Sequence, residues 1–263
     1  MSIAGGMDLA IERGTSIGCE AIQIFLKNAN QWCGRNISGT EARRFQSARG
    51  ALPVFAHSSY LINLGVPSPR SVSALVDEIR RADLLGVPFI VLHPGAHLGT
   101  GEATGLALVA RNLDSVFAAT PSSSVQIALE TTAGQGTCLG HRFEHLAAII
   151  QSSHHPNRLA VCVDTCHLFA AGYDIRTRRS YEVVMRQLDG LSVVAFHLND
   201  SKKPLGSRVD RHEHIGKGFL GLGAFRCVLQ DARWHGLPMV LETPKGKDTR
   251  EDVENLKVLR ALL

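Results

Sequence analysis

Histidine, aspartate and glutamate recur along the chain at one kind of position, the end of a short apolar run. The residues at or next to these ends are His57, His93, Glu130, Asp164, His197 and Glu242. One polar residue there is commonplace, because an Asp at a strand end is usually the N-cap of the next helix. Six residues of this kind need another explanation, and imidazole together with carboxylate is a donor set for Zn²⁺ or Mn²⁺. The pattern predicts a metal site.

Three further candidate ligands lie close to these ends. His167 follows Asp164 by three residues, and the stretch "VDRHEH" (209–214) adds Asp210 and His212. Nine ligands exceed the three or four that a single tetrahedral ion takes, so they suit two or three ions if some carboxylates bridge. Clustered divalent ions are typical of phosphodiester cleavage, because one activates water and others neutralise the phosphoryl and leaving oxygens.

The apolar runs themselves have the length of buried strands. They cover residues 21–26, 52–57, 88–93, 125–130, 159–164, 193–198 and 238–243. Segments such as 71–86 and 141–153 lie between them and have apolar residues at helical spacing. This alternation predicts βαβ units, a parallel sheet and a single-domain α/β fold over residues 1–263, a TIM (β/α)8 barrel. In such a barrel the C-terminal strand ends share one face, where active sites are built.

Seven runs are visible, whereas an eight-stranded barrel needs one more. The segment "GGMDLAIERGTSIG" (5–18), which precedes the first run, has a helical pattern. We therefore expect the remaining strand before Met1. Without it, the first and last strands would have exposed edges, which favour aggregation.

Composition agrees with an ordinary globular protein. The 263 residues are 44% hydrophobic and 20% charged, enough to bury a large core. No stretch reaches the roughly 18 apolar residues of a membrane span, the start lacks a secretory signal, and the six cysteines show no CxxC pairing. We expect a cytoplasmic monomer that does not contact membranes. The net charge of +4 is weak evidence for a polyanionic partner. The basic residues of 201–217 are more suggestive, although a solvated loop is the default explanation for such a run.

Longer motifs resemble those of a known family. They are "HSSYLINLG" (57–65), "VLHPGAH" (91–97), "ALETTAGQG" (128–136), "VDTCHLFAAGYD" (163–174), "GSRVDRHEHIGKG" (206–218) and "LETPKG" (241–246). In this order they resemble the signature blocks of endonuclease IV, a family of zinc-dependent TIM-barrel apurinic/apyrimidinic endonucleases.

The resemblance implies three zinc ions, with Mn²⁺ an alternative at one position. His57, His93 and Glu130 would hold the first ion. Glu130 would bridge to a second, completed by Asp164, His197 and Glu242, and His167, Asp210 and His212 would hold the third.

The resemblance also implies a reaction, the hydrolysis of the phosphodiester 5′ to an abasic site in duplex DNA. The products are a 3′-hydroxyl and a 5′-deoxyribose phosphate, and blocked 3′ ends are repaired by the same phosphodiesterase activity. Glu130 would be the catalytic residue, orienting the zinc-activated water or taking its proton.

Four residues are expected to contact DNA. Tyr60 and Leu61 would enter the duplex where a base is absent, and Lys217 would contact a phosphate. Asn30 stands where the family often has an arginine that inserts into the DNA stack. Either Arg35 substitutes for that arginine or the grip on DNA is weaker.

Two other functions stay open. A sugar isomerase or epimerase on the same barrel would also use strand-end Glu, Asp and His, with one or two metal ions. The nine ligands, the pair Tyr60–Leu61 and the basic loop 202–217 argue against it. A non-catalytic relative that binds abasic DNA is the second alternative, although a bridging carboxylate such as Glu130 would have no use in it.

Overall fold

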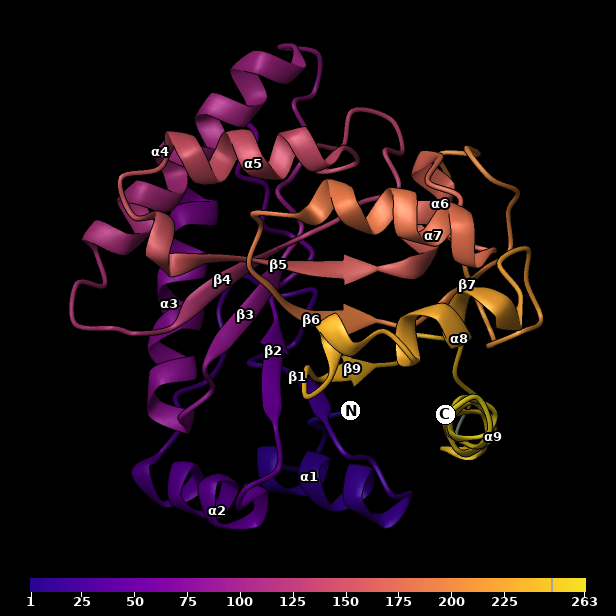
Figure 1. Cartoon of the computed structure of the whole chain (residues 1–263). Coiled ribbons are helices and arrows are strands. Elements are labelled where there is room, and N and C mark those ends of the chain that lie inside the picture. The colour runs from indigo at the N-terminus through magenta and orange to yellow at the C-terminus, as the bar shows by residue number, and fades with distance from the viewer. Residues whose placement is uncertain (247) are drawn as a thin grey trace.

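Seven parallel strands form the centre of the molecule (Figure 1). The computed structural model describes residues 1–246 and 248–263. The sheet has the order β1-β2-β3-β4-β5-β6-β9. Its strands are β1 Ile22–Phe25, β2 Val54–His57, β3 Phe89–Leu92, β4 Gln126–Glu130, β5 Leu159–Asp164, β6 Val193–His197 and β9 Met239–Val240. All seven predicted strands are confirmed, as is the single-domain α/β barrel.

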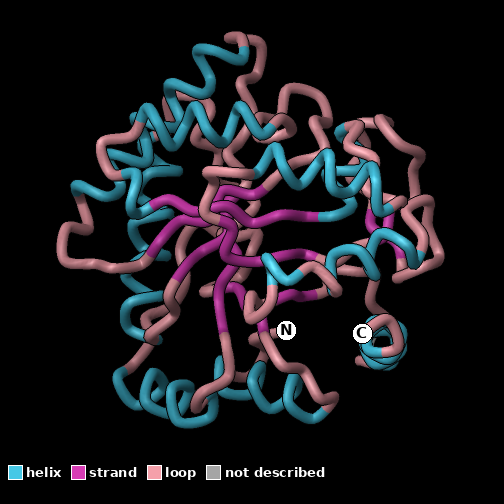
Figure 2. The backbone as a smooth tube through the Cα atoms, viewed as in Figure 1, coloured by secondary structure: helices cyan, strands magenta, loops and turns pink. Residues whose placement is uncertain are grey.

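Helices surround these strands (Figure 2). They are α1 Met7–Ser16, α2 Gly39–Arg49, α3 Pro69–Leu85, α4 Glu102–Ala118, α5 Phe143–Ser152, α6 Thr165–Ala171, α7 Arg178–Met185, α8 Leu222–Leu229 and α9 Arg250–Arg260, with short 3₁₀ turns at 156–158, 186–188 and 232–234. The predicted helical segments 71–86 and 141–153 correspond to α3 and α5. No helix in the described part of the chain is both long and apolar enough to cross a bilayer.

Local sequence signals set several helix ends. Ser38 accepts a hydrogen bond from the backbone N–H of Glu41, and the Glu41 side chain accepts one from Ser38, so a capping box begins α2. In α3, Ser68 caps the N-terminus and Pro69 occupies the first turn. Gly86 ends α3 in the left-handed conformation, with φ of 70°.

The interior of the barrel follows the two-residue period of strands. Small and aromatic side chains form a buried inner cluster of Phe55, Phe89, Val91, Ala128, Ala160, Cys162, Ala195 and Val240. Side chains two positions apart on a strand point to the same face. His57, Glu130 and Asp164 each lie two residues beyond a member of this cluster, so they point into the barrel at its C-terminal end. The alanines below them leave room for several ligands to meet.

A two-stranded ribbon follows β6. Asp200–Ser201 (β7) pairs in antiparallel fashion with His212–Glu213 (β8). This pairing orders both ends of the exposed basic segment 201–217. It also places His212 beside the mouth of the barrel.

The sheet does not close on itself among the described residues. β1 and β9 end the strand order, and no ladder joins them. This is the seam expected from seven visible strands. The strand expected before Met1 stays a prediction.

Candidate metal centre

The first ligand group lies over β2, β3 and β4. Nε2 of His93 is 2.8 Å from Oε2 of Glu130, and Nε2 of His57 is 3.2 Å from the same oxygen. The two imidazole rings are 5.3 Å apart and perpendicular to each other. Their ligand atoms lie close enough to hold one ion together.

The second group shares Glu130 with the first. Nδ1 of His197 is 2.8 Å from Oε1 of Glu130, 3.2 Å from Oε2 of Glu242 and 3.9 Å from Oδ2 of Asp164. The two oxygens of Glu130 thus face different ligand groups. Glu130, Asp164 and His197 are fully buried, whereas Glu242 is partly exposed.

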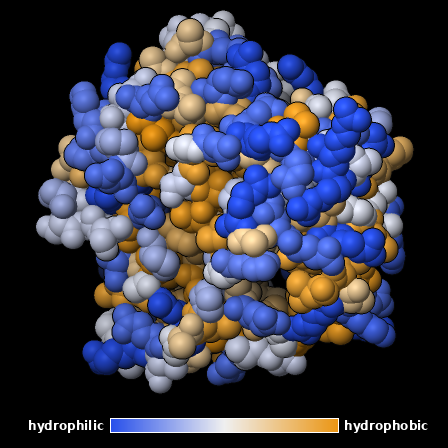
Figure 3. All heavy atoms as spheres, in the orientation of Figure 1, coloured by the Kyte–Doolittle hydropathy of each residue, from blue (hydrophilic) through white to orange (hydrophobic). Residues whose placement is uncertain are grey.

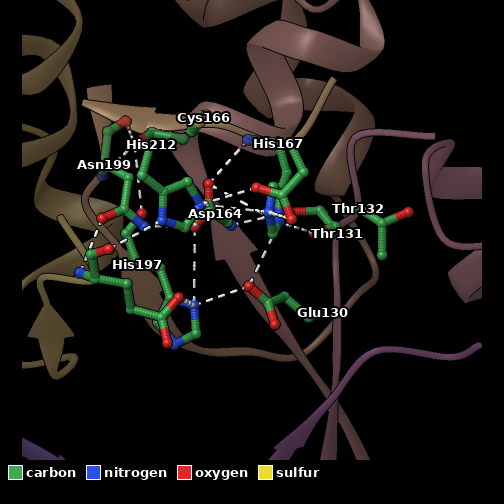
Figure 4. Close-up of polar contacts among 12 residues, drawn as sticks. Glu130, Thr131, Thr132, Asp164, Cys166, His167, His197, Asn199 and His212 are labelled. Carbon is green, nitrogen blue, oxygen red and sulfur yellow. Dashed lines mark hydrogen bonds and ion pairs between the residues drawn. The ribbon is translucent and has the colours of Figure 1, made fainter. Parts of the chain in front are cut away.

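The third group brings together residues from α6 and the β7–β8 ribbon. Nε2 of His167 is 3.2 Å from Oδ2 of Asp210, and Nε2 of His212 is 3.4 Å from Oδ1 of Asp210. Nε2 of His212 is also 3.7 Å from Oδ2 of Asp164, so the second and third groups adjoin. Figure 4 shows Glu130, Asp164, His167, His197 and His212 directed toward one another.

The hydrogen bonds of the imidazoles test whether these residues fit metal ions. Nδ1 of His57, His167 and His212 lies 2.8, 2.8 and 3.1 Å from the carbonyl oxygens of Ser58, Thr131 and Glu242 respectively. A carbonyl can only accept, so each Nδ1 carries a proton and donates it. In a neutral ring the other nitrogen then presents a lone pair.

Those lone pairs face carboxylate oxygens, an arrangement that is repulsive unless a cation lies between the two groups. His197 follows the same rule with its nitrogens exchanged: Nε2 lies 2.7 Å from Oε1 of Gln23, and Nδ1 faces the carboxylates. Ligand imidazoles anchored in this way through their second nitrogen are typical of metal sites. The residues fit divalent metal ions.

The electrostatics of the metal-free site are consistent with that fit. Burial opposes ionisation of Glu130, yet the charges of His197 and His93 hold its pKa well below the usual value. Burial likewise disfavours the imidazolium of His167, but Asp164 and Asp210 raise its pKa well above the usual value. Protons on the histidines therefore balance the carboxylates when no metal does.

Two side chains orient the second group. Asn199 donates from Nδ2 to Oδ2 of Asp164 (2.7 Å) and accepts from the backbone N–H of Glu242 (2.8 Å). Gln23 donates to Oε1 of Glu242 (2.6 Å) in addition to accepting from His197. Gln23 is not among the residues expected from the sequence, although a polar residue inside the apolar run "AIQIFL" is a signal for it.

Asp164 is both a helix N-cap and a candidate metal ligand, the two roles considered for an aspartate at a strand end. Its Oδ1 accepts from the backbone N–H of His167 at 2.8 Å and caps α6, while Oδ2 faces the metal groups. The cap therefore also fixes the position of His167 in the first turn of α6, because one side chain both caps the helix and faces the metal groups.

The structure places two of the expected DNA-contacting segments side by side. The hydroxyl of Ser59 donates to the carbonyl of Ala29 at 2.6 Å, joining the loop that carries Tyr60 and Leu61 to the loop that carries Asn30. Tyr60 is 57% exposed, and its ring packs edge-on to Phe25 with centroids 5.5 Å apart. Asn30 is exposed and Leu61 half-buried.

A buried ion pair that sequence analysis also missed supports the same two loops. The Lys27 ammonium, two residues after the end of β1, pairs with the Glu78 carboxylate on α3. Glu78 also accepts from the backbone N–H of Ser59 at 3.1 Å. The only indication of this ion pair in the sequence is a lysine that directly follows the apolar run 21–26.

Arg35 is engaged in an ion pair. Its guanidinium binds Glu41 at the start of α2 through two contacts of 2.5 and 3.0 Å. This pairing competes with the role considered for Arg35 as a substitute for the family arginine.

Lys217 lies in an exposed loop that a single carboxylate organises. Asp200 is fully buried and accepts backbone N–H bonds from Gly216, Gly218, Leu220 and Gly221 at 2.9 to 3.3 Å. A Cβ at position 218 would lie 2.5 Å from Oδ1 of Asp200, so only glycine fits there. The loop that presents Lys217 is thus tied to β7 through Asp200.

One other cluster of potential ligands occurs among the described residues outside this centre, formed by Glu102, His141 and His145. Arg142 already donates to Glu102 at 2.7 Å, and the backbone N–H of Gly140 donates to Nδ1 of His145 at 3.2 Å. Nε of Arg142 also donates to Nε2 of His145 at 3.0 Å, so hydrogen bonds already occupy both ring nitrogens that a metal would need.

Comparisons with known proteins agree with this geometry. Residues 11–262 match the family model described as "Xylose isomerase-like TIM barrel". "Probable endonuclease 4" of Chloroflexus aurantiacus is 49% identical over 274 residues, which cover 100% of this chain and 96% of the relative. Endonuclease IV from Thermus thermophilus superposes with a TM-score of 0.87 at 37% identity, covering 100% of this chain and 96% of that one.

A D-psicose 3-epimerase from Clostridium cellulolyticum superposes with a TM-score of 0.73 at 15% identity, covering 100% of this chain and 95% of that one. Similarity at that level reflects the barrel fold alone. The endonuclease relatives, in contrast, match at high identity over nearly their whole length. The chain belongs to the endonuclease IV family of xylose isomerase-like TIM barrels.

Proposed function

We propose that this protein is a metal-dependent DNA repair endonuclease that hydrolyses the phosphodiester 5′ to abasic sites. Its products would be a 3′-hydroxyl and a 5′-deoxyribose phosphate, and the same site would remove blocked 3′ ends. The observation that carries the proposal is a continuous set of three ligand groups in which Glu130 belongs to two. The names of the endonuclease relatives supply the DNA substrate.

The ligand set suits three zinc ions, with Mn²⁺ an alternative at one position. Nitrogen and oxygen donors without thiolate are those that zinc accepts in catalytic sites. Divalent ions bound there would activate water and neutralise the phosphoryl and leaving oxygens.

Glu130 is the residue best placed to handle the proton of the attacking water. Its Oε2 faces the first group and its Oε1 the second, at the centre of the buried site. A low pKa keeps it ionised at neutral pH. It can therefore accept a hydrogen bond from a water between the groups and orient that water toward phosphorus.

Substrate contact is assigned to the loops around the barrel mouth. The ring of Tyr60 and the side chain of Leu61 would fill the space left by the missing base. Asn30 would donate or accept a hydrogen bond in the same region of the duplex, and Lys217 would form an ion pair with a phosphate. Burial raises the pKa of Tyr60 to about 12, so its hydroxyl stays neutral beside the DNA backbone.

The direct test is incision of a duplex that carries one abasic site, with an undamaged duplex of the same sequence as control. The proposal predicts cleavage of the damaged duplex only, on its 5′ side, with a 3′-hydroxyl that a polymerase extends. A second duplex ending in a 3′-phosphate tests the repair of blocked ends. Epimerisation of a ketohexose without any DNA incision would instead support the sugar-enzyme alternative, and abasic-DNA binding without incision would support a non-catalytic relative.

A further inference from the structure

The ion pair between Lys27 and Glu78 is buried although neither residue belongs to the metal centre. Most charged side chains of the protein lie at the surface, and hydrophilic atoms cover much of the face in Figure 3. The side chains of Lys27 and Glu78 are only 2% and 1% exposed. Burial of two charges costs free energy that good geometry and further hydrogen bonds must offset. The other partners of this pair therefore indicate what it holds in place.

Both contacts of Glu78 converge on one carboxylate oxygen. Its Oε1 accepts from the Lys27 ammonium and, at 3.1 Å, from the backbone N–H of Ser59. Its Oε2 has no hydrogen-bond partner within the part of the chain that the structure describes. Lys27 therefore balances the charge of the carboxylate, and the N–H of Ser59 is the group that the carboxylate positions.

The N–H of Ser59 belongs to the same peptide group as the carbonyl of Ser58. That carbonyl accepts a hydrogen bond of 2.8 Å from Nδ1 of His57. The peptide group is trans and planar, so its N–H and its C=O point in opposite directions. Glu78 thus binds one side of this peptide group, and the His57 imidazole binds the other. A displacement of the peptide group would turn the His57 ring, whose Nε2 faces Glu130.

The same loop holds Tyr60 against the His57 ring. The centroids of these two rings are 5.4 Å apart, and both rings also pack on Phe25, at 5.5 Å from Tyr60 and 5.6 Å from His57. The hydroxyl of Ser59 accepts from the backbone N–H of Leu61 at 3.3 Å. Movement at Ser59 would therefore shift a candidate metal ligand together with the residues expected to enter the duplex.

Helix α3, which carries Glu78, also holds the loop after β1. Arg81 lies three residues after Glu78 and donates to the backbone carbonyls of Gly34 and Arg35 at 3.0 and 2.9 Å. Asp77 fixes the guanidinium of Arg81 through a contact of 2.7 Å. Both loops are therefore attached to one buried face of a single helix.

We propose that Glu78, with its charge balanced by Lys27, is a positioning residue for the metal centre. Through the Ser58–Ser59 peptide group it holds the His57 imidazole in the orientation that presents Nε2 to the first ligand group. A ligand imidazole depends on the group that accepts from its second nitrogen, and Glu78 fixes that group. Glu78 also holds Tyr60 at the mouth of the barrel. The contribution to DNA selectivity rests on the proposed function, whereas the restraint on His57 does not require it.

Two double variants separate hydrogen bonding from charge. Both carry Lys27→Met, so that no unpaired ammonium is left buried. Glu78→Gln, added to this change, keeps an oxygen that accepts from the N–H of Ser59, whereas Glu78→Leu has no acceptor. Hydrogen exchange in peptides covering 57–62 is measured without metal. Release of zinc to a chelator and the binding preference for abasic over intact duplex are measured with zinc present.

The variant with Glu78→Leu is expected to speed exchange at 57–62 and the release of one zinc ion by about tenfold each, and to lower the preference for abasic duplex. The variant with Glu78→Gln should stay within about twofold of the unsubstituted chain. Equal behaviour of the two double variants would make the ion pair structural only and would overturn the proposal. A difference in exchange and zinc release, without any preference for abasic DNA in the unsubstituted chain, would refute the proposed function alone.

Glu78→Asp provides a second test, because loss of a buried acceptor can also prevent folding. It keeps the negative charge beside Lys27 but withdraws the carboxylate from the N–H of Ser59 by one methylene. Exchange at 57–62 should therefore rise. Glu254→Asp makes the same change at an exposed position of α9 and should leave it unaffected. Exchange at the native rate in Glu78→Asp would overturn the proposal.

Discussion

At the scale of single residues, the proton positions on four histidines carry the argument for metal. His57, His167 and His212 donate from Nδ1 to carbonyl oxygens. His197 instead donates from Nε2 to the side-chain oxygen of Gln23. Each remaining nitrogen therefore faces carboxylates at distances that only a proton or a cation makes favourable. Four carboxylates meet there, two of them fully buried (Glu130 and Asp164), and divalent metal ions would balance their charge.

Replacing Glu130 tests the central residue of this arrangement. In Glu130→Gln the amide keeps the shape of the side chain but cannot accept a proton from water. We expect incision of abasic DNA to fall at least about 100-fold, with affinity for the uncleaved duplex nearly unchanged. Single-turnover kinetics and a DNA-binding titration measure the two quantities.

Glu254→Gln on α9 makes the same chemical change at an exposed position and should leave both quantities unaffected. Cleavage by Glu130→Gln at the native rate would remove Glu130 from the mechanism.

The nine candidate ligands could be proposed from the sequence because each follows a strand or a recognisable motif, and the structure brings their side chains together in three groups. The sequence could not predict the orienting bonds of Gln23. These join residues 174 and 219 positions apart in the chain, to His197 and Glu242. No local pattern encodes such contacts, which exist only once β1 and β9 approach across the barrel.

At the scale of elements, loops at the C-terminal strand ends present the groups expected to meet DNA. Asp200 organises one of them by accepting four backbone N–H bonds from the segment 216–221. Ser59 and Glu78 tie together two others. Sequence patterns indicated these segments as loops, but not the carboxylates that hold them.

Asp200→Asn should loosen the Lys217 loop. The amide would turn an N–H₂ group toward backbone donors, so the free energy of unfolding is expected to fall by about 2 kcal/mol or more. Urea unfolding measures this change. Asp189→Asn, at an exposed position, serves as the matched control, and equal stabilities of the two variants would contradict the role of Asp200.

Tyr60→Ala tests the loop after β2. Because stacking of an aromatic ring is worth about 1–3 kcal/mol, preference for abasic over intact duplex should fall about tenfold, with zinc content unchanged. Binding to both duplexes gives the ratio. Val253→Ala removes an exposed apolar group from α9 and should preserve it. Equal weakening on both duplexes would assign Tyr60 a general packing role.

At the scale of the whole molecule, the parallel order of seven strands determines the site. Each strand end brings its ligand to the same face, so residues from 57 to 242 meet within one centre. Strand lengths and order could be predicted because buried parallel strands are short apolar runs. The β7–β8 ribbon could not, because its two-residue strands have no recognisable pattern.

Loading the whole centre with zinc should release protons. In the metal-free protein the carboxylates, working against burial, raise the pKa of His57 and His167, which therefore bind protons near neutral pH. Zinc must displace these protons, so its apparent affinity rises with pH until the raised pKa values are passed, and falls at lower pH. Calorimetric titration of zinc in two buffers of different ionisation enthalpy should give different heats. Identical heats would show that the histidines are already neutral.

The most direct test of a shared multinuclear centre is the number of zinc ions bound to the folded chain, counted by native mass spectrometry. The three contiguous ligand groups predict about three ions. Loss of His212 in His212→Ala should reduce the count by one, since only the third group contains it. A chain that binds a single ion, with the same count in His212→Ala, would contradict such a centre.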